Sequence, residues 1–324
     1  MIARTSRAFG RSIAVVMLSV VLALLAAPLG AAAQDATPMA SPEADALAAT
    51  GLPEITITAQ ETIYSPSVPG AMLEGWYIIT LVNETDAVAS ASLGSLPEGQ
   101  TVGDLTSVLS TSFKGEGGEL PAWWSEASFA GGNVAAPGET TRTLAYLTPG
   151  RWVIFSTNPA STQSPAVFTI LTPEEAEANY GIVPEASPVA SPAAGAVPAP
   201  AGVTADVTLE VSDTGVEMAS GTLAAGDVVV QVTNTGEQVH DLIVVRSDAA
   251  VDEAGAAELA GAFARGEALT GATVVGGVGT LGAGQSAYAT MTLEPGTYVL
   301  FSSLPDTTGG LQLDAGVITV LTVE

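Results

Sequence analysis

Two long stretches of this chain recur in the same order further along it, and this repeat limits the possible folds more than any other feature. Residues 74–93, EGWYIITLVNETDAVASASL, align with residues 225–244, AGDVVVQVTNTGEQVHDLIV. Residues 136–157, APGETTRTLAYLTPGRWVIFST, align with residues 282–303, GAGQSAYATMTLEPGTYVLFSS. Two matches in the same order predict a tandem duplication, in which each copy builds its core from the same set of elements.

The repeated segments have the periodicity of strands. Val228, Val230 and Val232 fall on one face of an expected strand, because successive side chains of a strand point to opposite faces. Pro-Gly turns bound other short β-branched and aromatic runs. Trp76 and Trp152 lie in such runs and are expected in the core. The pattern predicts an all-β protein made of two antiparallel β-sandwiches.

Each copy also contains one insert with helical character. In the first copy it is TVGDLTSVLSTSF, residues 101–113. In the second copy it is DEAGAAELAGAFARGEAL, residues 252–269, whose Ala and Leu residues favour a helix. We therefore expect one short helix between the middle strands of each sandwich.

The N-terminal segment, residues 1–33, has the features of a signal peptide. Three arginines precede a long apolar run, and Ala31 and Ala33 form an A-x-A cleavage pattern. The alternative is an uncleaved membrane anchor, since the apolar run is long enough to span a bilayer. The segment predicts a secreted or extracytoplasmic protein, which meets the membrane only if the segment stays uncleaved.

Two stretches of small residues and prolines divide the rest of the chain. Residues 34–50 predict a disordered spacer, and residues 183–204, which contain five prolines, predict a semi-extended linker. Between and after them lie two parts of ordinary domain size, residues 51–182 and residues 205–324. They are called the first half and the second half below.

The chain is strongly acidic, lacks cysteine and has one histidine. Residues 1–33 hold three of the eight Lys+Arg and none of the 34 Asp+Glu, so the remaining chain carries 5 − 34 = −29 charges. This charge argues against nucleic acid as a partner. Without cysteine there is no disulfide, no thiolate ligand and no thiol nucleophile, and one histidine excludes most metal sites and general-base arrangements.

The second half has a characteristic order of segments. A strand ending in Asn234 is followed by His240, a long insert, LGAGQSAYATMTLEPGTYVLFSSLP, and a closing GGLQLDAGVITVLTV. This order resembles the cupredoxin family, the blue-copper β-sandwiches. The resemblance covers nearly all of residues 205–324 and, more weakly, residues 51–172. It implies that each half is a Greek-key cupredoxin-like sandwich.

The resemblance also assigns positions to the family's copper ligands. A blue-copper site needs two imidazoles, one thiolate and usually a weak axial thioether. In the second half the corresponding positions are occupied by His240, Ser302, Gln312 and Val317. In the first half they are occupied by Ala89, Ser156 and Val167. One ligand of four remains in the second half and none in the first, so we predict a degenerate copper site, no type 1 copper and no cofactor.

His240 is open to two interpretations. It is either a surviving ligand of a weak copper(II) or zinc site, together with Asp241 or Gln238, or a strand-edge histidine satisfied by hydrogen bonds. We favour the second, because one imidazole cannot make a closed transition-metal site. A hydrolase that uses Ser156, Thr157, Ser302 or Ser303 as nucleophile is disfavoured, because the chain has no G-x-S-x-G elbow and one histidine in all.

The adjacent Trp123 and Trp124, in the insert of the first half, are the candidate interaction surface. We expect one to pack inward and the other to be partly exposed, where an indole can stack on a sugar or anchor a partner. The alternative is that both only pack the insert onto the sandwich. Asn83-Glu84-Thr85 fits an N-glycosylation pattern, but Asn234 occupies the equivalent place without one, which favours a turn role for both.

Together these features predict an exported, non-enzymatic binding or interaction protein. Its partner would be a protein, a glycan or a small molecule. Two alternatives remain open. One is a copper-handling or metal-binding periplasmic or extracellular protein that uses His240, and the other is an envelope structural protein. Replacing His240 with Ala abolishes metal binding under the copper-handling alternative and changes little under the first prediction.

Overall fold

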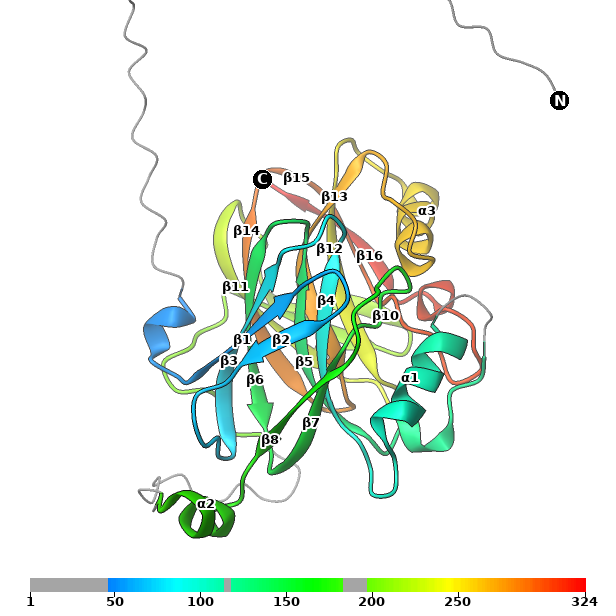
Figure 1. Ribbon diagram of the computed structural model, residues 1–324. Coiled ribbons are helices and arrows are strands. Elements are labelled where there is room, and N and C mark those ends of the chain that lie inside the picture. The colour runs from blue at the N-terminus through cyan, green and yellow to red at the C-terminus, as the bar shows by residue number, and fades with distance from the viewer. Residues whose placement is uncertain (1–45, 114–117, 183–196) are drawn as a thin grey trace, which may run out of the picture. The chain divides into compact units, whose positions relative to one another are not determined.

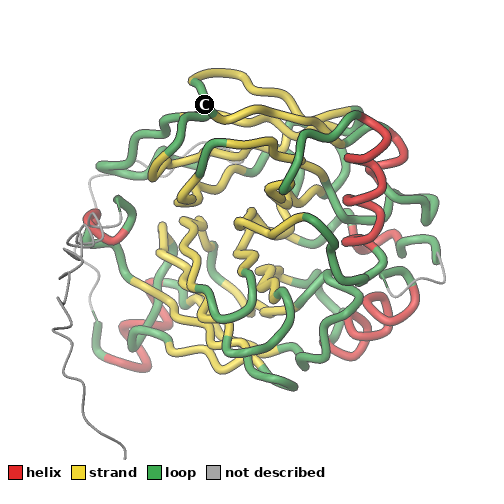
Figure 2. Tube along the Cα trace, turned by 90° about the horizontal axis from the view of Figure 1, so that it is seen from above, coloured by secondary structure: helices red, strands yellow, loops and turns green. Residues whose placement is uncertain are grey.

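The computed structural model describes residues 46–113, 118–182 and 197–324. The predicted signal peptide, residues 1–33, lies outside this part. The described residues from 46 onward belong to one compact unit of two stacked layers of strands, with helices at the periphery (Figure 1, Figure 2). No helix among the described residues is long and apolar enough to cross a membrane.

The two halves have matching series of strands. The elements of the first half are β1 (Glu54–Ala59), β2 (Tyr64–Ser67), β3 (Gly75–Asn83), β4 (Ala89–Ser95), α1 (Val102–Thr111), β5 (Ser128–Ala135), β6 (Thr140–Leu147), β7 (Gly150–Phe155), β8 (Ala166–Ile170) and α2 (Pro173–Tyr180). Those of the second half are β9 (Val207–Ser212), β10 (Gly215–Gly221), β11 (Gly226–Asn234), β12 (His240–Ser247), α3 (Glu253–Ala264), β13 (Ala272–Leu281), β14 (Ser286–Leu293), β15 (Gly296–Phe301) and β16 (Ile318–Val323). The predicted all-β class is confirmed.

Each half contributes four strands to each of two sheets. The first sheet has the order β10-β9-β11-β14-β6-β3-β1-β2, and the second has the order β16-β15-β12-β13-β5-β4-β7-β8. From the junction outward, the first sheet has β14, β11, β9 and β10 in the second half and β6, β3, β1 and β2 in the first half. The second sheet has β13, β12, β15 and β16 in the second half and β5, β4, β7 and β8 in the first half. Equivalent strands therefore follow the same order in both halves. Each half is therefore a sandwich of its own, and the two sandwiches are joined edge to edge through both layers.

The junction between the halves consists of two antiparallel pairs of equivalent strands. Tyr288 of β14 lies opposite Leu144 of β6, and Val278 of β13 lies opposite Asn133 of β5. Side chains add to this pairing, because the backbone N–H and the hydroxyl of Thr280 both donate to Ser92 Oγ, at 3.1 and 2.9 Å. The two halves are thus continuous in hydrogen bonding.

Not all neighbouring strands are antiparallel. β1 pairs in parallel with β3, and β9 pairs in parallel with β11. In each half the chain passes through one intervening strand, β2 or β10, and returns to the starting end before the pair forms. This is the crossover that parallel neighbours require.

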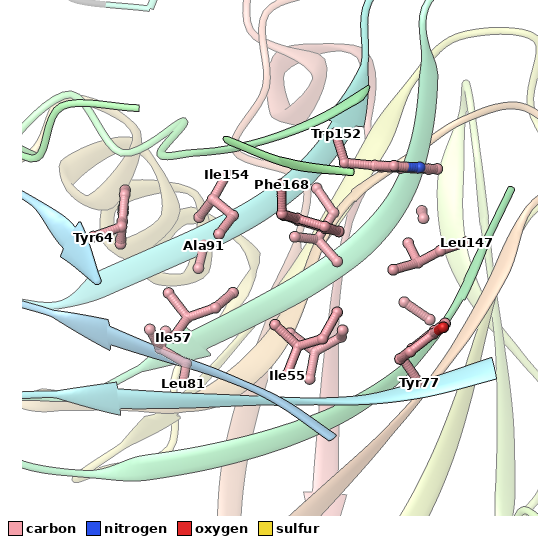
Figure 3. Close-up of a cluster of buried hydrophobic side chains, with 14 of the residues drawn as sticks. Ile55, Ile57, Tyr64, Tyr77, Leu81, Ala91, Leu147, Trp152, Ile154 and Phe168 are labelled. Carbon is pink, nitrogen blue, oxygen red and sulfur yellow. The ribbon is translucent and has the colours of Figure 1, made fainter. Parts of the chain in front are cut away.

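Each sandwich encloses its own hydrophobic core. In the first half the core side chains of the two layers point toward one another, including Ile55, Leu81, Trp152 and Phe168 (Figure 3). In the second half the predicted face of β11 is confirmed, because the side chains of Val228, Val230 and Val232 are all buried in the core.

The two tryptophans expected in the core, Trp76 and Trp152, lie on different faces of their sheets. Trp152 is 2% exposed and lies in the core, as predicted. Trp76 points to the outer face of the first sheet, so the prediction for it was wrong. It packs edge-on against Tyr146 and Tyr288, at ring-centroid distances of 5.6 and 5.8 Å. Strand alternation alone does not say which of two faces is covered by the opposite sheet.

Both predicted helices are present. α1 begins with a capping box, in which Thr101 and Asp104 bond each other's backbone N–H, and α3 begins at Asp252, whose side chain accepts from the N–H of Gly255. α2 was not predicted. Its signals were present, since Thr172 and Glu175 form a capping box and Gly181 ends the helix in the left-handed conformation.

The ends of the predicted spacer and linker are structured. Leu47 is fully buried, and Ala48–Thr50 form a 3-10 helix, so the expected disorder of residues 34–50 is wrong for its last residues. Pro198 accepts a hydrogen bond from Trp76 Nε1 at 2.8 Å, and Val203 packs against the same outer face. These segments are held because they cover the apolar outer face of the first sheet. The rest of both stretches, residues 34–45 and 183–196, lies outside the described residues.

Candidate functional site

The four sequence-assigned positions of the second half meet at one end of its sandwich. His240 opens β12, Ser302 follows β15, and Gln312 opens the 3-10 helix Gln312–Ala315. Gln312 Oε1 lies 2.6 Å from His240 Nδ1 and accepts from Ser302 Oγ at 2.7 Å, while the N–H of Ser302 donates to the carbonyl of Val317 at 3.0 Å. All four residues are at most 2% exposed.

Gln312 determines the direction of the hydrogen bonds around it. Its Nε2 donates to the carbonyls of Val239 and Pro305, at 2.9 and 3.2 Å, so this end of the amide must be the donor. Oε1 therefore faces His240 and Ser302 and can only accept. It follows that His240 Nδ1 carries a proton.

The other nitrogen of His240 faces a carboxylate. Nε2 lies 2.9 Å from Oδ1 of Asp213, which stands in the turn between β9 and β10 and keeps 31% of its side chain exposed. Partial burial opposes ionisation of Asp213, but the backbone N–H groups of Glu237 and Gln238 and the His240 side chain hold its pKa below the ordinary value. Both imidazole nitrogens are thus engaged by oxygen atoms.

Gly236 provides the space for this pair. A Cβ at position 236 would lie 2.5 Å from Asp213 Oδ1 and 2.8 Å from His240 Nε2. Both distances are shorter than van der Waals contact allows, so only glycine fits without displacing the pair.

Asp241 is the second carboxyl group of the site and is 1% exposed. It accepts from the backbone N–H and the hydroxyl of Ser303, at 2.7 and 2.6 Å, and from Ser302 Oγ at 2.9 Å. Burial raises its pKa, against the opposing effect of the Ser303 and Ser302 hydrogen bonds and of nearby His240. We call His240, Asp241, Ser302, Ser303, Gln312 and Asp213 the buried polar network.

The structure does not bring together the residues considered as co-ligands of His240. The carboxyl group of Asp241 bonds the two serines, and the side-chain oxygen of Gln238 accepts from the N–H of Thr307 at 3.2 Å. Among residues 46–113, 118–182 and 197–324 no group of three or more His, Asp and Glu side chains is placed to hold a metal ion. The donor set at the four positions, with a hydroxyl in place of a thiolate and an isopropyl group in place of a thioether, does not fit type 1 copper.

The geometry also disfavours a serine nucleophile. Ser302 Oγ faces Gln312 and Asp241, and Gln312 Oε1 accepts from both Ser302 and His240. A serine nucleophile needs a base bonded directly to its hydroxyl and access for a substrate, whereas Ser302 is fully buried. What the network does is join the ends of β12 and β15 to the loop that precedes β16.

The equivalent corner of the first half holds uncharged groups. Ala89 and Ser156 occupy the places of His240 and Ser302, and Ser156 Oγ lies 2.7 Å from Ser90 Oγ. Asn158 completes this corner by donating its N–H to Ser156 Oγ at 3.1 Å. The hydroxyl of the buried Tyr64 donates to the carbonyl of Ser90 at the same corner. This corner is thus closed without a histidine or a carboxyl group.

The correspondence of Val167 with Val317 was wrong. Ala166 pairs with Ile154, and Thr319 pairs with the equivalent Leu300, so Val167 matches Val320, and Ser164 matches Val317. Val167 is 44% exposed, whereas Val317 is fully buried. The loop before the last strand differs in length between the halves, and a comparison of sequences does not detect this.

The predicted interaction residues separate by burial. Trp124 is 3% exposed and packs among aromatic rings, with its centroid 4.8 Å from Phe129 and 5.4 Å from Phe113. Trp123 is partly buried and lies 6.0 Å from Trp124. Of the two indoles, Trp123 is the one available to a partner in this conformation.

Asn83 has a structural role. It is 1% exposed, and its Nδ2 donates to the carbonyls of Ala87, Ala135 and Ala136 at 2.8 to 3.1 Å. Asn234 makes the matching bonds to Gln238 and Leu281. The turn role that the repeat favoured for both residues is therefore confirmed.

The sequence analysis did not identify Asp213. It lies 27 residues before His240 in a short turn, and nothing in the local sequence links the two. Tyr180, an exposed apolar residue at the end of α2, also had no predicted role, and Val167 was predicted only as a former ligand position.

Comparison with known proteins gives structural similarity only. No protein-family model matches the chain, and no curated protein matches it in sequence. Among solved structures, auracyanin from the photosynthetic bacterium Roseiflexus castenholzii is 22% identical, with 37% of this chain and 99% of that chain covered and a TM-score of 0.27. Copper nitrite reductase from Nitrosomonas europaea is 14% identical, with 84% and 93% covered and a TM-score of 0.20. The account of the fold rests on the strand order and register given above.

Proposed function

We propose that this chain is an exported, non-enzymatic binding protein built on two joined cupredoxin-like sandwiches, neither of which holds type 1 copper. One observation carries the proposal. Both imidazole nitrogens of His240 face side-chain oxygens, of Gln312 at 2.6 Å and of Asp213 at 2.9 Å. A metal ion could reach the imidazole only if these two contacts were given up.

The surroundings of His240 support the same proposal. The chain contains no cysteine, so no thiolate is available for the copper bond that defines a type 1 site. Ser302 is fully buried, and its hydroxyl bonds the amide of Gln312 and the carboxyl group of Asp241, without access for a substrate, which supports the absence of hydrolase activity. Export rests on the arginines, the apolar run and the A-x-A pattern of residues 1–33.

Metal titration tests the proposal directly. We expect calorimetric titration with Cu²⁺ and Zn²⁺ to give no tight stoichiometric binding at micromolar metal, and the copper titration to give no copper–thiolate absorption. Tight binding at one metal per chain that is lost in His240→Ala would contradict the proposal and favour the copper-handling alternative. Weak binding that persists in His240→Ala comes from exposed carboxylates and leaves the proposal in place.

A further inference from the structure

A groove opens at the outer end of the first half, between the edge strands β2 and β8. Its volume is about 290 Å³, and its lining includes Pro66, Val68, Met72, Val167, Phe168 and Tyr180. Met72 and Phe168 belong to the core of the first half, so the floor of the groove is the core itself. Tyr180 comes from the last turn of α2. We call this feature the β2–β8 groove.

Exposed apolar side chains gather at this groove. Within the described part of the chain the large hydrophobic residues with exposed side chains are Ile63, Val68, Val167, Tyr180, Ile182 and Met218. Three of them line the groove, Ile63 precedes β2 directly, and Ile182 follows α2. Only Met218 lies elsewhere, on β10 of the second half. An apolar concentration of this kind on an acidic surface indicates a docking site.

The backbone at the groove is open between two closed ends. At one end Ser164 N–H donates to the carbonyl of Thr62 at 2.8 Å, and at the other Leu171 N–H donates to the carbonyl of Met72 at 2.7 Å. Among the described residues, β8 pairs between these contacts only with β7, and β2 only with β1. The described part of the chain therefore leaves the outer backbone groups of β8 to a further strand.

β8 is the better template of the two edges. β2 contains Pro66, which has no backbone N–H to donate and is typical of protected edge strands. β8 has the sequence AVFTI, with no proline, no glycine and no charge. An extended peptide that adds to such an edge gains affinity from main-chain hydrogen bonds and specificity from alternate side chains.

The charged residues near the groove determine which flanking residues a bound segment would need. The residues that line the groove carry no charge. The charged residues next to them in the described chain are Glu61 and Glu74, beside the segments that close its two ends, three glutamates of α2 (Glu174, Glu175 and Glu177), and Arg151 of β7. Arg151 is the one cation among them, and on β7 it lies opposite Thr169 of β8. The carboxyl groups of Glu74 and Glu175 already accept from Tyr146 and from the N–H of Thr172. The remaining excess of carboxylates over cations in the segments next to the groove favours basic residues on either side of an apolar stretch.

We infer that the β2–β8 groove binds an extended apolar segment of a partner polypeptide, flanked by basic residues, which adds to β8 as a further strand. The inference rests on the proposed binding function and names the class of partner. The apolar side chains of the segment cover Val167 and Tyr180, and its flanking cations lie near the glutamates.

A synthetic peptide tests this on the purified chain. We use the fluorescein-labelled peptide KVTVTVK and measure anisotropy, with KVTPTVK, which cannot form a continuous strand, and EVTVTVE, which reverses the charge, as controls. We expect saturable binding of KVTVTVK, weakened by salt, and about tenfold weaker binding of either control. If KVTVTVK does not bind, or if all three peptides bind alike, the inference is overturned.

Matched variants locate the binding. Val167→Asp and Tyr180→Ala each weaken the binding of KVTVTVK by about tenfold, whereas Met218→Asp, at the exposed apolar residue on the equivalent edge of the second half, changes it by less than about twofold. Since all three side chains are exposed, we expect unchanged melting temperatures. Equal binding by the Val167→Asp and Met218→Asp variants would overturn the inference.

Two further measurements separate other outcomes. If the chain dimerises with rising concentration in analytical ultracentrifugation, and Val167→Asp abolishes dimerisation, the groove is occupied by a second copy and the peptide inference is overturned. The metal titration is independent of the groove, because Val167 lies in the first half. Tight metal binding refutes the proposed function alone, and failure of KVTVTVK in a chain that binds no metal refutes the groove inference alone.

Discussion

The equivalent corners of the two halves have the same backbone arrangement but are closed by different kinds of side chain. In the second half the corner is closed by the imidazole of His240, the carboxyl groups of Asp213 and Asp241, and the amide of Gln312. In the first half it is closed by hydroxyl and amide groups, with Ala89 in the place of the imidazole. This corner therefore forms without a histidine or a carboxyl group, and in the first half the buried hydroxyl of Tyr64 contributes to it.

The two corners carry different energetic risks. A buried ionisable group is tolerated only when its partners are complete, because the loss of one partner leaves another polar group unsatisfied in a low-dielectric interior. The serine and asparagine corner has smaller penalties, because neutral hydrogen bonds are weaker and cost less to lose. The second half should therefore be the more sensitive of the two to single substitutions.

Replacing His240 tests this difference with the largest expected effect. His240→Ala removes a buried side chain and leaves its partners Gln312 and Asp213 without their hydrogen bonds to it, and we expect it to lower the free energy of unfolding by about 3 kcal/mol. Ser156→Ala, which removes the hydroxyl that bonds Ser90 at the corner of the first half, is the matched control and should cost about 1 kcal/mol. Urea unfolding measures both, and equal losses would show that the two corners are energetically alike.

Replacing Asp241 sharpens the comparison through pH. Because burial raises the folded-state pKa of Asp241 above its ordinary value of 3.8, its contribution to stability is fully present below that value and is lost as pH rises through the folded-state pKa. Asp241→Asn keeps the shape and cannot ionise. We expect the stability of the variant relative to the original chain to increase as pH rises from 4 to 7.

The same pH series also measures the contribution of Asp213, whose dependence on pH has the opposite sign. The lowered pKa of Asp213 acts in the other direction, so its contribution is present above the ordinary value and is lost as pH falls below it. Asp241→Asn leaves that acid-side loss unchanged. Urea unfolding at each pH gives both trends, and a difference between the two chains that is constant from pH 4 to 7 would show that Asp241 does not titrate in this range.

Weakening the junction gives the smallest expected effect. Thr280→Val keeps the side-chain shape and removes the hydroxyl that donates to Ser92 in the other half, at a cost of about 1 kcal/mol. Since both sheets run through both halves, we expect a single unfolding transition that shifts as a whole. Thr322→Val, on the partly exposed edge strand β16, is a control that should change little. Two separate transitions in calorimetry would show that the halves unfold independently.

Local sequence patterns were sufficient for the strands of the repeated segments and for two of the helices. The alternation in β11 and the Pro-Gly turns before β7 and β15 depend on residues close in the chain, so they could be recognised without the tertiary structure. The meeting of His240, Ser302, Gln312 and Val317 followed from resemblance to a family, because those residues lie in three separate segments.

Other features were decided only by the tertiary structure. The pairing of β5 with β13 and of β6 with β14 depends on which strand edges remain free after each sandwich forms, and the sequence carries no local signal for this. The partnership of Asp213 with His240, the outward position of Trp76 and the β2–β8 groove have the same origin. By itself, the sequence determined the strands of the repeated segments and that no thiolate exists. The tertiary structure decided which of their faces and edges are covered, because burial depends on packing between segments that are distant in the chain.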